Sequence, residues 1–169
     1  MSDQPGPAVA VIGKIEATFG AAGLQPVRAN IGPAVAVVGT TSRFRWRWMA
    51  TKLNVGIYAA WFLPATPVEM LDQYLAAACQ DAIDRKGALR GMQTGVAAIT
   101  VAIVDSATPE QISWASTPHG RRFAAITFPV MVDAGTRRVV RPERMVLGGI
   151  YTGYLKELVS THIEAPISH

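Results

Sequence analysis

The sequence predicts a single α+β domain in which helices pack on a mixed, mostly antiparallel sheet of about six strands. Helical periodicities lie at both ends of the chain, and strand-like segments lie between them. A length of 169 residues suits one domain, and no repeat, low-complexity tract or linker divides the chain. The predicted element order is α-β-β-β-α-β-α-β-β-α, within one domain over 1–169 that has flexible tails at 1–7 and 165–169.

The first third of the chain predicts a helix followed by a three-stranded antiparallel meander. Apolar residues recur at helical spacing from Val11 to Phe19 and predict a helix over 8–22. The segments that follow are rich in β-branched, small and aromatic residues, which favour strands. The predicted strands are 34–40, 43–48 and 54–63.

Two capping patterns mark helix starts in the remainder of the chain. Thr66-Pro67-Val68-Glu69 predicts the start of a helix that ends at Gly87. Thr108-Pro109-Glu110-Gln111 predicts a short helix that reaches Ala115. Pro129 cannot donate to a ladder, which places its strand at a sheet edge or a bulge. The other predicted elements are strands at 96–104, 123–132 and 137–141 and a helix at 150–163.

The most informative segment is Arg43-Phe44-Arg45-Trp46-Arg47-Trp48, because it lies in a window without any Asp or Glu between Glu16 and Glu69. Strict alternation is typical of a strand and places the guanidinium groups on one face and the aromatic rings on the other. The carboxylates that pair with these arginines must therefore come from elsewhere in the fold, from another chain or from a ligand. The simplest interpretation buries the aromatic face and leaves the arginines in water.

Two functional interpretations of this segment remain open. Arginines at two-residue spacing form an array of forks for phosphates or carboxylates, and neighbouring rings stack on bases. Alternatively, Trp and Arg are enriched where protein interfaces bind most strongly. The candidate anion-binding residues are Arg43, Arg45, Arg47, Lys52, Trp46, Trp48, Arg121 and Arg122.

Composition limits the class of protein. Hydrophobic residues make up 50% and charged residues 17% of the chain, so we expect apolar surface to be covered by a second copy or a protein partner. The net charge of +4 permits anionic ligands, nucleic acid included. The single cysteine, Cys79, is predicted to be a buried thiol and suits a reducing compartment. The N-terminus lacks a basic secretory region and no apolar run spans a bilayer, so we predict a cytoplasmic protein without a membrane segment.

The predicted order α-β-β-β-α-β over roughly residues 8–104 resembles the core of restriction-endonuclease-like nucleases. That resemblance implies Asp and Glu on the second and third strands, followed by a Lys, to hold a metal ion for phosphodiester hydrolysis. The acid-free window covers this whole region. The resemblance therefore does not extend to that chemistry.

One constellation outside this window suggests acid–base chemistry. His119 lies in a predicted loop, and Asp105 ends a predicted strand from which it could approach the imidazole. Neither has a sequence motif around it, and we expect no metal and no cofactor because the chain has no recognisable motif for either.

The sequence supports three functional hypotheses. The leading one is a small protein that acts by protein–protein binding as a homodimer, without a catalytic centre. The alternative is a binder of anions or single-stranded nucleic acid through Arg43, Arg45 and Arg47. A second alternative is an enzyme centred on His119 and Asp105.

Overall fold

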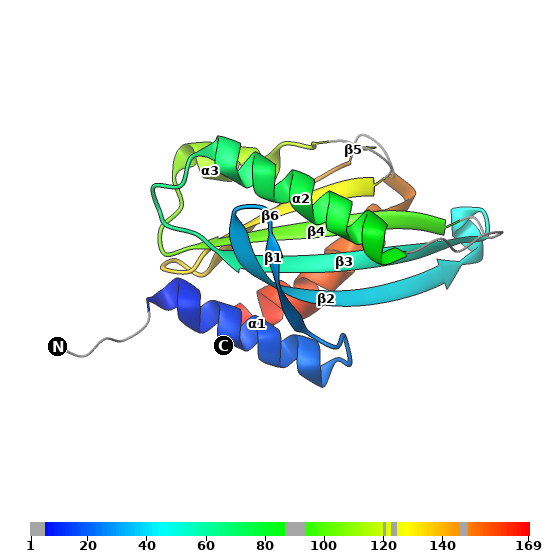
Figure 1. The fold of residues 1–169 in the computed structure, drawn as a ribbon, viewed down its shortest axis with the longest axis horizontal. Helices are drawn as coiled ribbons and strands as arrows, with labels where there is room; N and C mark the ends of the chain where they lie inside the picture. Colours follow the sequence, from blue (N-terminus) through cyan, green and yellow to red (C-terminus); the bar gives the residue numbers. More distant parts are fainter. Residues whose placement is uncertain (1–5, 87–93, 120, 123–124, 146–148) are drawn as a thin grey trace.

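The computed structural model describes residues 6–86, 94–119, 121–122, 125–145 and 149–169, in which one mixed sheet lies between two helical layers (Figure 1). The strand order is β1-β2-β3-β4-β6-β5, with β7 also paired to β6. Strands β3, β4 and β6 are parallel to one another, and the other neighbouring strands are antiparallel. The predicted fold class is confirmed. The strands are β1 (Val27–Ile31), β2 (Ala34–Arg45), β3 (Thr51–Trp61), β4 (Thr94–Val104), β5 (Arg121–Arg122), β6 (Ala125–Asp133) and β7 (Arg138–Val140).

The helices divide between the two faces of the sheet. Figure 1 shows α2 and α3 on one side and α1 and the C-terminal helices on the other. A 3-10 turn lies between β2 and β3, another precedes α4, and a π-helical segment joins α4 to α5. The helices are α1 (Pro7–Ala21), α2 (Val68–Lys86), α3 (Pro109–Ser116), α4 (Thr152–Val159) and α5 (Ala165–Ser168), the 3-10 turns η1 (Trp46–Trp48) and η2 (Gly149–Tyr151), and the π-helical segment η3 (Ser160–Glu164).

Strand β4 shows why both faces need a helical layer. Its apolar residues alternate between the two core clusters, as the period of a strand requires. Ala97, Ile99, Val101 and Ile103 join the cluster that contains α1 and α4, whereas Ala98, Ala102 and Val104 join the cluster that contains α2 and α3. The prediction of a strand covered on both faces is confirmed.

The strand boundaries of the meander differ from the prediction. The predicted strands 34–40 and 43–48 form one strand, β2, up to Arg45, and β1 precedes it. Strand β1 was not predicted because it is a short edge strand between the turn-forming pairs Gln25-Pro26 and Gly32-Pro33.

The capping prediction for α3 is confirmed. Thr108 Oγ1 accepts a hydrogen bond from the Gln111 backbone N–H at 3.3 Å, and Gln111 Oε1 accepts from the Thr108 N–H at 3.0 Å. Helix α2 begins at Val68, and the carbonyl of its predicted cap, Thr66, accepts from Gln111 Nε2 at 2.9 Å. Gln111 therefore joins the starts of both helices. The predicted stop at Gly87 lies outside the described residues.

Pro129 lies where β6 is locally an edge. It pairs with Thr100 of β4 on one side. On the other side, β5 pairs only as far as Ile126, and β7 pairs only from Met131 onward. Of the described strands, none pairs with this side of β6 between those two points, so the missing N–H breaks no described ladder there.

The predicted tails need correction at both ends. Residues 165–168 form α5, in which Ile167 is 2% exposed and packs in the core cluster that contains α1. A stretch this short has too little periodicity to reveal a helix, and the burial of Ile167 decides its conformation. At the other end α1 begins at Pro7, and the Ala8 N–H donates to Asp105 Oδ1 at 2.8 Å. Residues 1–5 lie outside the described chain.

His162 is a buried titratable side chain in the π-helical segment. Its ring meets the Phe19 ring edge-on with centroids 6.1 Å apart, and its Nδ1 makes no hydrogen bond in the described structure. Burial lowers the pKa of His162 below its ordinary value of 6.5. The folded protein therefore holds this imidazole neutral at a pH where the unfolded chain already binds a proton.

The protein should lose stability when the pH falls through 6.5, the unfolded value for His162. Because only the unfolded chain takes up the proton there, the free energy of unfolding falls as the pH falls. The loss stops growing below the lower pKa of the folded protein. Urea unfolding at about pH 7.5 and about pH 5.5 measures the loss. His162→Gln should flatten this dependence, while the control His169→Gln, at an exposed position, should retain it. An equal loss in wild type and His162→Gln would contradict the assignment.

Candidate functional site

The β2–β3 hairpin positions most of the residues predicted to bind a ligand. Its antiparallel register pairs Thr40 with Gly56, Ser42 with Asn54, and Phe44 with Lys52. Side chains alternate along each strand, so even-numbered residues face the α2 side of the sheet and odd-numbered residues face the α4 side. The hairpin thus presents two chemically different faces.

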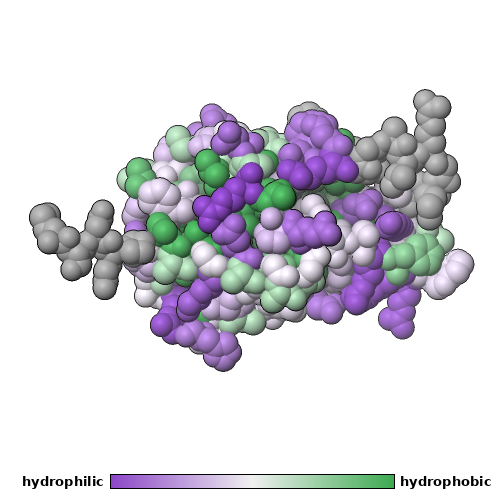
Figure 2. All heavy atoms as spheres, turned by 60° about the horizontal axis from the view of Figure 1, so that its bottom comes forward, coloured by the Kyte–Doolittle hydropathy of each residue, from purple (hydrophilic) through white to green (hydrophobic). Residues whose placement is uncertain are grey.

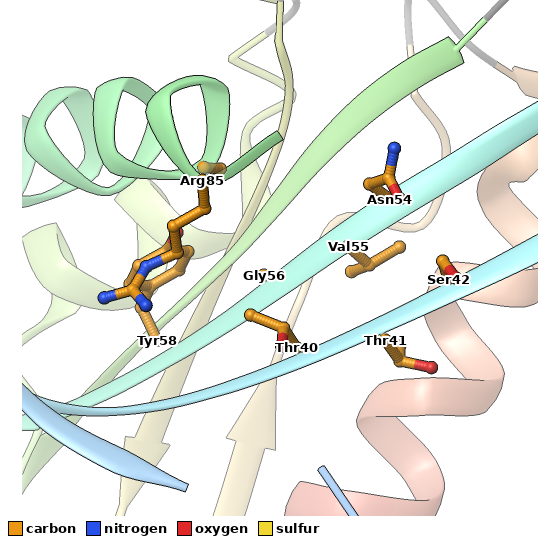
Figure 3. A pocket seen from close by; sticks show the side chains of 9 residues that line it. Thr40, Thr41, Ser42, Asn54, Val55, Gly56, Tyr58 and Arg85 are labelled. Atoms are coloured by element: carbon orange, nitrogen blue, oxygen red, sulfur yellow. The ribbon is translucent and has the colours of Figure 1, made fainter. Parts of the chain in front are cut away.

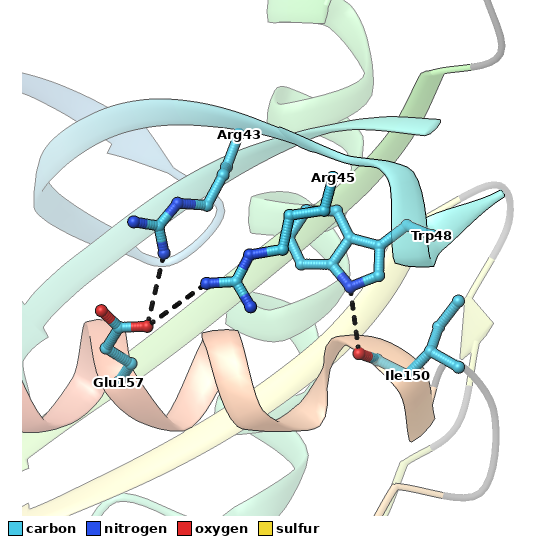
Figure 4. A network of polar contacts seen from close by, with 5 residues as sticks. All are labelled: Arg43, Arg45, Trp48, Ile150 and Glu157. Atoms are coloured by element: carbon cyan, nitrogen blue, oxygen red, sulfur yellow. Dashed lines mark hydrogen bonds and ion pairs between the residues drawn. The ribbon is translucent and has the colours of Figure 1, made fainter. Parts of the chain in front are cut away.

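On the α4 side, Arg43 and Arg45 share the carboxylate of Glu157 (Figure 4). The nitrogen–oxygen distances are 3.4 Å for Arg43 and 3.8 Å for Arg45. Both guanidinium groups also lie over the buried Tyr154 ring, with Cζ at 4.9 Å and 5.6 Å from its centroid. The carboxylate comes from elsewhere in the fold, which is one of the three sources that the sequence left open.

Trp48 is part of the core and does not continue the strand. Strand β2 ends at Arg45, and the 3-10 turn η1 moves the indole to the α4 side, where it is 2% exposed. Its Nε1 donates to the Ile150 carbonyl at 3.1 Å, and its ring contacts Tyr151 and Tyr154 (Figure 4). The predicted strand over 43–48 is therefore wrong after Arg45. Burial of a large ring with its donor satisfied outweighs the local alternation.

The remaining aromatic residues of the segment are exposed, contrary to the interpretation that placed them in the core. Trp46 is 81% and Phe44 43% exposed, and their rings meet edge-on with centroids 5.3 Å apart. Phe44 lies on the α2 side, beyond the described end of that helix at Lys86, and Trp46 contacts it from η1. Figure 2, which turns the α1 side of the molecule forward, shows hydrophilic side chains beside a small hydrophobic group at its right-hand end.

Two cations border these rings. Arg47 is exposed in η1, and Lys52 pairs across the hairpin with Phe44. Neither forms an ion pair with any residue that the structure describes. We call Thr40, Ser42, Phe44, Trp46, Arg47, Lys52 and Asn54 the hairpin surface.

A pocket of about 520 Å³ opens at the inner end of the hairpin surface (Figure 3). Its polar side-chain groups on the α2 side are two hydroxyls, an amide, a phenol and a guanidinium, and Gly56 and Ala82 supply a small apolar surface. It lies between β2, β3 and the C-terminal part of α2. The lining residues are Thr40, Thr41, Ser42, Asn54, Val55, Gly56, Tyr58, Ala82 and Arg85.

The inner wall of the pocket is a hydrogen-bonded cluster. Tyr58 donates its hydroxyl to Asp81 Oδ2 at 2.8 Å, and Arg85 Nε donates to the same oxygen. Burial, reinforced by the Asp81 carboxylate, raises the pKa of Tyr58 well above its ordinary value, so the phenol stays protonated. Gly56 is required beside this ring, because a Cβ there would lie 2.5 Å from Tyr58 Cε2.

Asn54 supplies the one polar atom of the pocket that is buried without a partner. Its amide Nδ2 makes no hydrogen bond with any described residue. An unpaired buried donor costs free energy, which a ligand that accepts the hydrogen bond would recover. Figure 3 shows the amide standing above β3 at the edge of the pocket.

The predicted pair of His119 and Asp105 is not formed. Asp105 accepts from Ala8 at the start of α1, as described above. His119 is in a second pocket, where its Nε2 donates to the Trp114 carbonyl at 2.8 Å and its Nδ1 lies 4.0 Å from Asp72 Oδ1. The carboxylate near His119 is therefore that of Asp72 and not that of Asp105, and Nε2 is already engaged with a backbone carbonyl.

Two further candidates can be placed only in part. Arg121 and Arg122 form β5 and pair with Ile126 and Ala125 of β6. Their side chains lie outside the structure's description. They belong to the opposite edge of the sheet from β1, separated from the hairpin by β4 and β6.

The geometry does not support metal-dependent hydrolysis at the hairpin. The observed order from α1 to β4 is that of the nuclease core that the sequence resembles, but β2 and β3 carry no Asp or Glu. Within the described residues, no three His, Cys, Asp or Glu side chains gather as a metal site would need.

The described helices include none that is long and apolar enough to cross a membrane.

The chain was compared with protein-family models, with curated proteins and with solved structures, and no match was found in any of the three.

Sequence reasoning missed the pocket residues Thr40, Ser42, Asn54 and Arg85 as a group. The available signal was polar residues at two-residue spacing within otherwise apolar strands, which places them on one face. The register that joins the strands was needed to bring them together.

The two neighbouring tryptophans should differ sharply in their contribution to stability. Trp48→Ala should lower the free energy of unfolding by about 3–5 kcal/mol, because it empties a buried site. Trp46→Ala should change it by no more than about 0.5 kcal/mol, because the ring lies in solvent. Urea unfolding followed by circular dichroism measures both. Similar losses in the two variants would show that the turn does not bury Trp48 selectively.

Proposed function

We propose that the protein binds single-stranded nucleic acid through the hairpin surface. The observation that carries the proposal is the exposure of the Trp46 ring, at 81%, beside Phe44 and within reach of cations that no described carboxylate neutralises. An exposed ring next to unpaired cations is the combination that single-strand binders use. The ring stacks on a base, and the cations contact the phosphates.

The arginines have different roles in this proposal. Arg43 and Arg45 are held by Glu157 on the α4 side and stiffen the hairpin from behind. Arg47 and Lys52 are left for phosphates. Of the four cations on this hairpin only Arg43 and Arg45 pair with a described carboxylate, and they share a single one, so the local potential stays positive.

Self-association through this surface is disfavoured by the same charges. A two-fold interface brings each patch against its own copy, so Arg47 and Lys52 would face like charges across it. The homodimer predicted from composition stays a prediction, and it would need a different face of the molecule. An anionic partner does not meet this obstacle.

A nucleic-acid strand fits the surface better than an acidic protein does. The hairpin surface combines flat rings with hydroxyl and amide groups that lead into a pocket, which suits bases on a flexible chain. The resemblance in element order to nucleases is an analogy at the level of the fold and adds no evidence about the site.

Fluorescence anisotropy of a labelled thymidine strand of about 12 nucleotides tests the proposal. We expect binding at low salt that weakens as salt rises, because phosphate contacts release counterions. Trp46→Ala should weaken binding by roughly 5- to 150-fold, the effect of losing one stacked base. The double variant Arg47→Gln/Lys52→Gln should reduce the slope of log K against log salt by about 1.4, or about 0.7 per lost phosphate contact.

The control removes the same charge elsewhere. Lys14→Gln/Arg138→Gln changes two exposed cations on α1 and β7 and should leave the salt slope as it is in wild type. Absence of binding at low ionic strength would refute the proposal. Equal weakening by the control variant would show attraction by net charge alone and would refute the hairpin surface as the site.

A further inference from the structure

We infer that the pocket between β2, β3 and α2 receives one base of the bound strand and that this base is adenine. The inference rests on the proposed function and names the specificity of the same site. Three features of the pocket carry it: its continuity with the exposed rings, its charge, and the unpaired amide of Asn54.

The pocket and the rings are successive positions on one face of β2. Ser42 lines the pocket, and Phe44 is two residues further along the same strand. Two residues of a strand span roughly 7 Å, about twice the ~3.4 Å separation of stacked bases. A base in the pocket and a base on the Phe44–Trp46 pair can therefore belong to one strand, no more than two nucleotides apart.

The charge of the pocket favours a base over a phosphate. Arg85, the one cation among its described lining residues, already donates Nε to Asp81, which also accepts from Tyr58. The guanidinium and the carboxylate compensate each other, so the pocket carries little net attraction for an anion. Gly56 and Ala82 add a small apolar surface. A neutral, planar group with a polar edge is the ligand that matches these walls.

Asn54 selects among such groups. A primary amide carries a donor and an acceptor side by side, and Nδ2 lacks an acceptor in the described structure. Adenine presents the complementary pair, since its N7 accepts while its N6 amino group donates. The volume of about 520 Å³ leaves room for a purine. The hydroxyls of Thr40 and Ser42 lie on the same wall and complete the polar rim.

Two labelled strands of about 12 nucleotides test the assignment by anisotropy, one all thymidine and one with adenine at every third position. Wild-type protein should bind the adenine-containing strand roughly 5- to 150-fold more tightly, the discrimination that one bidentate pair provides. Asn54→Leu should abolish the preference, which is measured as the ratio of the two strands' affinities for the same variant. Asn54→Asp keeps the side-chain shape but replaces the donor by a charged acceptor, so it should abolish the preference and weaken binding of both strands.

The possible outcomes separate the two claims. If neither strand binds, the proposed function itself fails. If both strands bind equally well, or if guanine or cytosine in place of adenine binds as tightly, only the adenine pocket is overturned. A preference that persists in folded Asn54→Asp, with folding checked by circular dichroism, would also overturn it.

Discussion

The constraint on which the rest of the structure depends is that, among the described residues, helix α4 covers one face of the β2–β3 hairpin and α2 covers only part of the other. Helix α4 lies under the odd-numbered face, where Glu157 holds Arg43 and Arg45 and where Trp48 is buried. On the even-numbered face, the described part of α2 ends at Lys86, opposite the middle of the hairpin. The proposed binding of nucleic acid rests on the part of this face that stays exposed, which is the hairpin surface.

In this arrangement, some of the alternating arginines and aromatic residues pack against α4, and the others stay exposed to solvent. Two arginines and one tryptophan fix the hairpin to α4 through an ion-pair network and cation–π contacts. Such partly exposed pairs add little stability individually, but together they fix the orientation of the strand. The rings of Phe44 and Trp46 are consequently held in solvent on a rigid support. A rigid aromatic surface loses little conformational entropy when it stacks on a ligand.

Local patterns predicted the elements whose cause is local. The predictions of the α3 capping box and of a strand β4 covered on both faces were both correct, because each depends only on residues that are close together in the sequence. Alternation around Arg45 showed that two faces exist but could not show which is buried. That choice depends on Glu157, 114 residues away from Arg43. The pocket depended in the same way on the pairing of Ser42 with Asn54, which no local pattern contains.

The most direct test of the central claim is a nuclear magnetic resonance titration of the labelled protein with a short single strand. The two indole N–H signals of the hairpin report its opposite faces, since Trp46 is exposed and Trp48 donates to Ile150. Our account predicts that the Trp46 indole and the backbone signals of Ser42 and Asn54 shift, while the Trp48 indole does not. Shifts confined to α4, or a shift of the Trp48 indole without one at Trp46, would contradict it.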